Sequence, residues 1–157
     1  MEKVYMTPSG FKTLEEELKN LKLVERPAVV NAIAEAREKG DLSENAEYSY
    51  AKERQGFIEG RIRELESKLA RAEVVDVTKL EGKNVKFGAT VTVFDEAADE
   101  EITYKIVGVD EADIKQKLLS IDSPLARALI GKNVGDEIKL DTPSGKRKYE
   151  VVEVSYI

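Results

Sequence analysis

The chain has 157 residues, of which 41% are hydrophobic and 36% are charged, and its formal net charge is −6. It contains no cysteine and no histidine, which excludes disulfides, thiolate chemistry, Ser-His-Asp catalysis and the usual zinc and copper sites. Any chemistry therefore rests on carboxylates, hydroxyls, lysines and arginines, which suit Mg²⁺. The first residues do not read as a secretory signal, and no apolar stretch approaches the roughly 20 residues of a membrane span. We expect a soluble, cytoplasmic protein with no membrane contact.

The charges are spread over both halves of the chain. Residues 1–75 hold 13 Lys and Arg against 15 Asp and Glu, and residues 76–157 hold 12 against 16. Neither half is a basic domain, so we do not expect the chain to bind RNA or DNA independently.

Residues 1–75 carry apolar residues in steps of three and four, which predicts two long helices. The first stripe contains Phe11, Leu14, Leu18, Leu21, Val29, Ile33 and Ala36, and the second contains Ala51, Ile58, Ile62, Leu65, Leu69 and Ala72. Thr7-Pro8 supplies an N-cap and a first-turn proline, and Pro27 predicts a kink or short break near Val24–Pro27. Because only Gly40–Ser43 separates the two helices, they should form an antiparallel hairpin.

Residues 76–157 change to short β-branched runs separated by turns, which predicts a small, mostly antiparallel α+β domain. The expected strands are Val85–Phe94, Glu101–Val107 and a closing hairpin of Asp136–Leu140 with Arg147–Val154. A short helix should open at Ser123-Pro124 and stop at Gly131.

The turn of the helical hairpin, Lys39–Tyr48, is called the tip below. Its acidic residues have a structural explanation, because Asp41 or Ser43 can cap the second helix and Asp41-x-x-Glu44 has the spacing of a capping box. Spacing alone favours capping. Placement at the far end of a long arm favours chemistry, because two carboxylates with open coordination can hold one Mg²⁺ weakly and complete a two-metal site for phosphodiester hydrolysis.

Four basic residues lie beside or at the edge of the tip, namely Arg37, Lys39, Lys52 and Arg54. They can guide a phosphate backbone, or they can pair with Glu35, Glu38, Glu47 and Glu53 as ordinary solvated surface. Tyr48 can stack on a base or support the turn. The sequence leaves these alternatives open.

Four segments carry a resemblance to a known family: Glu35–Tyr48, Gln55–Ile62, Phe87–Val93 and Ser123–Gly131. In this order they resemble the Gre transcript-cleavage factors over nearly the whole chain. The resemblance implies a coiled-coil hairpin, residues 1–75, and an FKBP-like domain, residues 76–157. It also implies that the second domain docks at the rim of the RNA polymerase secondary channel while the hairpin enters that channel.

By the same resemblance, Asp41 and Glu44 match the family's functional acidic pair. They would help to retain a Mg²⁺ ion shared with RNA polymerase, present only in the complex and not bound tightly by the free protein. Cleavage of the 3′ end of backtracked nascent RNA would then be an activity of polymerase that this protein stimulates, so the protein would not itself be an enzyme. The expected tip-supporting residues are Gly40, Ser43, Asn45 and Tyr48, and the expected docking residues are Ser123, Pro124 and Arg127. We expect a monomer.

Three alternatives remain at this point. A Gre-like inhibitor would have the same architecture but would block nucleotide entry. An FKBP-type prolyl isomerase would place the activity in the second domain, although fold does not imply function. A plain coiled-coil adaptor would tolerate changes to both tip acids.

Overall fold

The computed structural model describes residues 2–41 and 45–157. These residues form two compact units: Phe11–Ala72 make up most of the first, and Lys3–Gly10 together with Glu73–Ile157 make up the second. The structural division therefore falls after Ala72, close to the expected one after residue 75. The N-terminal segment belongs with the second unit, which the sequence pattern does not indicate.

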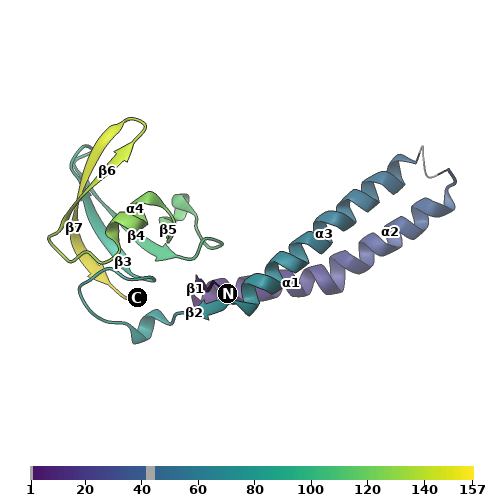
Figure 1. Cartoon of the computed structure of the whole chain (residues 1–157), viewed down its shortest axis with the longest axis horizontal. Coiled ribbons are helices and arrows are strands. Elements are labelled where there is room, and N and C mark those ends of the chain that lie inside the picture. Colours follow the sequence, from purple (N-terminus) through teal and green to yellow (C-terminus); the bar gives the residue numbers. More distant parts are fainter. Residues whose placement is uncertain (1, 42–44) are drawn as a thin grey trace. The chain divides into compact units, whose positions relative to one another are not determined.

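The first unit is an antiparallel helical hairpin (Figure 1). Helix α1 (Pro8–Asn20) continues through a π-helical turn, Leu21–Glu25, into α2 (Arg26–Glu38), and α3 (Ala46–Ala70) runs back beside them. The hydroxyl of Thr7 accepts a hydrogen bond from the backbone N–H of Gly10 (3.1 Å), which confirms the predicted N-cap with Pro8 in the first turn.

The π-helical turn explains an offset in the apolar stripe. Continued in alternating steps of four and three, the series that ends at Leu21 would reach residues 28, 32 and 35, whereas Val29, Ile33 and Ala36 are the buried ones. One extra residue rotates a straight α-helix by about 100°. A π-helical turn takes up one additional residue, and here the N–H of Arg26 donates to the carbonyl of Leu21, five residues earlier. The expected irregularity near Pro27 is therefore a widened turn.

The seam of the hairpin is apolar, as the stripes predict. The buried residues of the two stripes are Leu14, Val29, Ile33, Ala36, Ala51, Ile58, Ile62 and Leu65. Leu18 and Leu21 pack against the cluster formed by Val29, Ile58 and Ile62. The second stripe is wrong at its end, because α3 stops at Ala70 and Ala72 lies in a short strand, β2 (Ala72–Val74). Strand β2 pairs with β1 (Val4–Met6), a pair that the sequence analysis does not predict.

The second unit is built on a five-stranded sheet in the order β5-β4-β3-β7-β6. Its strands are β3 (Thr90–Asp95), β4 (Glu100–Val107), β5 (Leu118–Ser120), β6 (Glu137–Thr142) and β7 (Gly145–Ser155). Three of the four pairings are antiparallel, and β4 pairs with β5 in parallel. The mostly antiparallel expectation is thus confirmed, with β5 as an unpredicted edge strand.

One face of the sheet carries the core. Every second residue of β3 is buried, and helix α4 (Pro124–Leu129) contributes Leu125, Ala126 and Leu129 to the same cluster. The strand expected at Val85–Phe94 starts only at Thr90. Before it, the chain turns at Lys86–Gly88 because Gly88 has a φ of 86°, a backbone conformation that ends an extended run.

Candidate functional site

The tip begins where α2 ends. Lys39 is the C-cap of α2, and Gly40 follows with a φ of 116°, the left-handed conformation expected for the residue that ends this helix. Asp41 is exposed. Leu42, Ser43 and Glu44 lie outside the described residues, so the roles predicted for Ser43 and Glu44 stay predictions.

Asn45 is the N-cap of α3, and its side-chain oxygen accepts from the backbone N–H of Tyr48 (3.1 Å). The prediction that Asp41 or Ser43 caps this helix is wrong, because α3 starts at Ala46, later than the sequence spacing suggests. The other end of the same amide, Nδ2, donates to the carbonyl oxygen of Ala36 on α2 (2.6 Å). One side chain therefore satisfies backbone groups at the ends of both helices.

The four basic residues near the tip fall into two pairs with different surroundings. Lys39 forms an ion pair with Glu47 (2.7 Å), and Arg54 forms one with Glu25 (2.8 Å). The hydrogen bond with Glu47 raises the pKa of Lys39 above its ordinary value. In both cases a carboxylate offsets the positive charge. This agrees with the alternative in which the basic residues pair with acids on an ordinary solvated surface.

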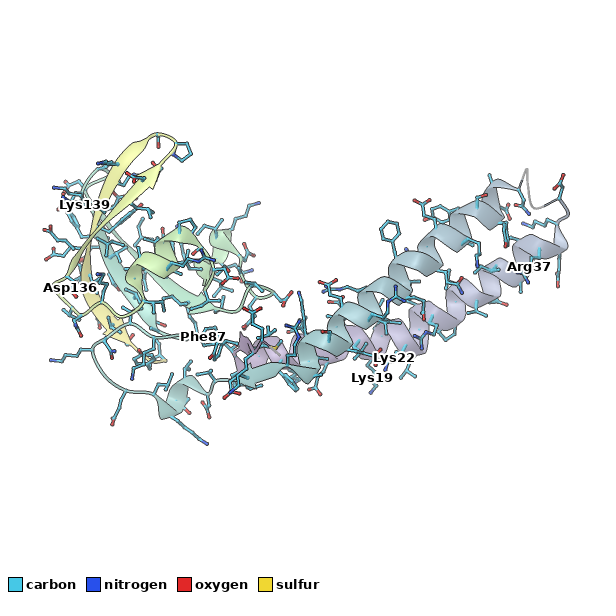
Figure 2. All side chains as sticks on the ribbon, viewed as in Figure 1. Lys19, Lys22, Arg37, Phe87, Asp136 and Lys139 are labelled. Carbon is cyan, nitrogen blue, oxygen red and sulfur yellow. The ribbon has the colours of Figure 1, made fainter. Side chains whose placement is uncertain are left out.

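Arg37 and Lys52 have neutral partners instead. The guanidinium carbon of Arg37 lies 5.8 Å from the centre of the Tyr48 ring, a cation–π contact. Lys52 Nζ donates to Gln55 Oε1 at 3.2 Å. Among the described residues, no carboxylate forms an ion pair with either cation. Figure 2 shows Arg37 near the end of the hairpin where α2 connects to α3.

Ion pairs between the helices brace the hairpin behind the tip. Arg26 on α2 binds Glu59 on α3 with two hydrogen bonds (2.8 and 2.9 Å), and Arg61 binds Glu17 in the same two-pronged way (2.6 and 2.9 Å). Hydrogen bonding to arginine lowers the pKa of both Glu17 and Glu59. Paired hydrogen bonds fix geometry as well as distance, so they hold α3 in register with α1 and α2.

The residues predicted for docking lie on the second unit, around the start of α4. Ser123 is the N-cap of α4: its hydroxyl accepts from the N–H of Ala126 (3.2 Å) and donates to the carbonyl of Ser120 (2.7 Å). Pro124 and Arg127 are exposed. Ser123 thus has a structural role, while the two exposed side chains are available to a partner.

Two features belong to the candidate site although the sequence analysis gives them no role there. Ala36 is predicted only as a seam residue, yet its carbonyl receives the Asn45 side chain. Glu25 is the partner of Arg54 across 29 positions of sequence. A contact between helices depends on their register. The extra residue in the π-helical turn at Leu21–Glu25 shifts that register, so counting residues along the chain does not predict which side chains meet.

Within residues 2–41 and 45–157, no three acidic side chains gather closely enough to hold a metal ion. The same part of the chain contains no helix that is long and apolar enough to cross a membrane.

Comparisons with known proteins identify the family. The family description "Transcription elongation factor, N-terminal" matches residues 4–74, and "Transcription elongation factor, GreA/GreB, C-term" matches residues 80–156. The chain is 62% identical to the transcription elongation factor GreA of Caulobacter vibrioides (strain NA1000 / CB15N) over 157 residues, which cover 100% of both chains. It is 63% identical to GreA of Cereibacter sphaeroides (strain ATCC 17025 / ATH 2.4.3), again over the full length of both.

Solved structures with a similar chain include GreA factor homolog 1 of Thermus thermophilus, at 29% identity and a TM-score of 0.45, covering 98% of this chain and 99% of that one. A GreA/GreB factor from Nitrosomonas europaea is 27% identical with a TM-score of 0.44, covering 98% and 100%. At these TM-scores the assignment rests on the sequence relatives, and the FKBP-like description of the second unit stays an expectation. The predicted family is confirmed: this chain belongs to the GreA/GreB family of transcription elongation factors.

Proposed function

We propose that this protein inserts its helical hairpin into the secondary channel of RNA polymerase and stimulates cleavage of the 3′ end of backtracked nascent RNA. The cleavage is the activity of polymerase, so the protein acts as a cofactor and is not itself a nuclease. The observation that carries the proposal is the exposed carboxylate of Asp41 at the end of a braced hairpin, in a chain whose full-length relatives are GreA elongation factors.

The hairpin suits the task of delivery. Helix α3 alone has 25 residues, which corresponds to about 37 Å at 1.5 Å per residue. An apolar seam and the two-pronged pairs Arg26–Glu59 and Arg61–Glu17 stiffen it. A stiff arm keeps the position of its end defined, and positioning is what lets a group contribute to a reaction at a distant centre.

Asp41 and Glu44 would act as oxygen donors to a Mg²⁺ ion that is shared with polymerase and not held tightly by the free protein. When bound, such an ion polarises the phosphodiester and activates water for its hydrolysis. Carboxylate oxygens are ligands that Mg²⁺ prefers. The contribution of this chain would be to bring that negative charge to the polymerase centre and to orient the attacking water.

Arg37 and Lys52, which form no ion pair with a carboxylate in residues 2–41 and 45–157, would contact the RNA backbone beside the tip. Lys39 and Arg54 are offset by Glu47 and Glu25, so they would contribute less to guiding the RNA than the sequence pattern suggests. Pro124 and Arg127 would lie on the polymerase-facing surface of the second unit. We also propose that the free protein is a cytoplasmic monomer.

A cleavage assay on a backtracked elongation complex with labelled RNA, polymerase and Mg²⁺ tests the proposal. The intact protein should accelerate cleavage, and Asp41→Asn and Glu44→Gln should bind in competition without accelerating it. Glu38→Gln, an exposed acid at the end of α2, is the matched control and should behave like the parent. Slower nucleotide addition without faster cleavage would identify an inhibitor. Full activity of the Asp41 and Glu44 variants would identify an adaptor with structural tip acids.

A further inference from the structure

Helix α3 carries two exposed aromatic side chains on one face. Phe57 is 73% exposed and Tyr50 is 67% exposed, the highest fractions for aromatic residues in the described part of the chain. Seven residues separate them, which is close to two full turns, so both side chains leave the same side of the helix about 10.5 Å apart along its axis. Single exposed apolar side chains are common on protein surfaces, but these two form a pair with space between them.

A surface pocket of about 250 Å³ lies between the two rings, lined by Tyr50, Glu53, Arg54 and Phe57. The guanidinium of Arg54 is already bound, because its Nη2 donates to Glu25 Oε2 at 2.8 Å. Glu53 is exposed, and its carboxylate forms no ion pair or hydrogen bond within residues 2–41 and 45–157. The pocket therefore combines two aromatic walls with one carboxylate whose charge is not offset.

This combination favours a cation. An aromatic face attracts positive charge within about 6 Å of the ring centre, and a group midway between the two side chains would lie about 5 Å from each. No cation of the described residues lies over either ring, since the two cation–π contacts involve Tyr48 and Tyr104. The cation that the pocket suits would therefore come from another molecule.

Arginine fits this pocket better than lysine does. Its guanidinium is planar, stacks on an aromatic face and makes two parallel hydrogen bonds to one carboxylate, whereas the ammonium of lysine is compact and strongly hydrated. An arginine side chain inserted between the rings would contact Tyr50 and Phe57 with its planar group while its N–H groups donate to Glu53.

The pocket lies on a different flank of α3 from the lysine that would contact RNA. Lys52 follows Tyr50 by two positions, which turns it by about 200° around the helix axis. Ala51 and Ile58, both buried in the seam, lie between these two flanks. Because the carboxylate of Glu53 repels phosphate, the flank with the aromatic pair suits a protein surface and not an RNA backbone.

We infer that Tyr50, Glu53 and Phe57 bind the guanidinium of an arginine on polymerase, so that this flank of α3 docks the hairpin against protein. The inference rests on the proposed function, which brings the hairpin into polymerase. It gives the two flanks of α3 different tasks, with Lys52 toward RNA and the aromatic pair toward the protein wall. Docking of this kind sets how tightly the factor binds and leaves the chemistry at the tip unchanged.

The test measures binding of the intact, fluorescently labelled protein to core polymerase that holds no DNA or RNA. Phe57→Leu keeps an apolar side chain but removes the aromatic face, and Glu53→Gln removes the charge at nearly constant shape. We expect each to raise the Kd about threefold to tenfold. Phe57→Tyr keeps the ring and should bind within about twofold of the parent. Glu53→Lys should raise the Kd about tenfold or more, because it sets like charge against the guanidinium.

Two matched controls test whether any change on the hairpin has the same effect. Val30→Ala shortens an apolar side chain on α2 that is 52% exposed, and Glu16→Lys makes the same charge reversal at an exposed position of α1. Both should bind within about twofold of the parent. The double variant of Phe57→Leu with Glu53→Gln should lose less than the product of the two single losses, because both side chains hold the same guanidinium.

Each result supports or overturns the inference. Binding of Phe57→Leu and Glu53→Gln like the parent overturns it. Losses that appear only in the backtracked complex also overturn it, as does tighter binding of Glu53→Lys, because both results identify RNA as the occupant.

Cleavage at saturating factor is measured in parallel. These variants should reach the maximal rate of the parent within about twofold, and a lower maximal rate with an unchanged Kd overturns the inference as well. A parent that binds core polymerase without accelerating cleavage overturns the proposed function, while the comparison of Kd values still decides the inference.

Discussion

The carboxylate of Glu111 accepts hydrogen bonds from both the backbone N–H (3.0 Å) and the hydroxyl of Thr7, 104 residues away in the sequence. The N–H of Gly108 donates to the same carboxylate (3.1 Å), and Thr7 is 5% exposed. The space is tight, because a Cβ at Gly10 would clash with the Glu111 carboxyl group. Glu111 therefore anchors the residue that caps α1 into the second unit.

Replacing Glu111 by glutamine should destabilise the second unit by about 1–2 kcal/mol. The carboxylate accepts from three donors, and the NH2 group of glutamine would face at least one of them and leave it without an acceptor. Urea unfolding followed by tyrosine fluorescence measures the change. Glu101→Gln, an exposed acid on β4, is the control and should shift stability by less than about 0.5 kcal/mol. Equal stability of the two variants would show that the anchor contributes nothing.

The widened turn at Leu21–Glu25 predicts an unequal response to deletions. Removing Val24, which is 57% exposed, together with Pro27→Ala should restore a regular α-helix and keep the seam in phase. The melting temperature of this variant, followed by circular dichroism at 222 nm, should stay within about 5 °C of that of the parent.

The control deletes Asn31 in the same Pro27→Ala background. That deletion lies beyond the widened turn and rotates Ile33 and Ala36 by about 100° out of the seam. We expect it to lower the melting temperature by about 10 °C or more. Similar losses in both variants would mean that the turn does not set the phase.

The Glu17–Arg61 pair predicts a dependence of stability on acid. Hydrogen bonding to Arg61 lowers the pKa of Glu17 below its ordinary value of 4.5, so the unfolded chain takes up a proton at higher pH than the folded chain does. The stabilisation is present above pH 4.5 and is lost as the pH falls below it. The side chains are 38% and 33% exposed, so we expect less than about 1 kcal/mol.

Urea unfolding between pH 7 and pH 3 tests this dependence. Glu17→Gln should reduce the loss of stability on acidification, while Glu16→Gln, an exposed neighbour, should leave the loss as in the parent. A Glu17→Gln curve parallel to that of the parent would show that the pair does not respond to acid in this range.

The surroundings of the four basic residues near the tip predict that Arg37 and Lys52 contribute more to RNA binding than Lys39 and Arg54 do. Arg37→Gln and Lys52→Gln should raise the factor concentration for half-maximal cleavage by about threefold to tenfold and lower its salt dependence by about one charge. Lys39→Gln and Arg54→Gln, whose partners are Glu47 and Glu25, should change it less than about twofold. The reverse order would favour the paired cations as the RNA contacts.

Sequence reasoning succeeds where one local pattern decides the outcome. The stripes predict the buried seam from Val29 to Leu65, and Ser123-Pro124 predicts the start of α4, because spacing and capping act within a few residues. The predicted cap of α3 is wrong: the sequence spacing points to Asp41 or Ser43, whereas the helix starts at Ala46 and Asn45 caps it. Strands β1, β2 and β5 are three residues long, too short for a period to show.

The widened turn also bears on how such a hairpin can change length. In a straight helix, one inserted residue would turn every later seam residue toward solvent, so many compensating substitutions would have to follow. A helix that takes up the residue within Leu21–Glu25 leaves the packing of Val29, Ile33 and Ala36 intact. A change of one residue in the length of the helix at this turn therefore leaves the seam between the turn and the tip in place.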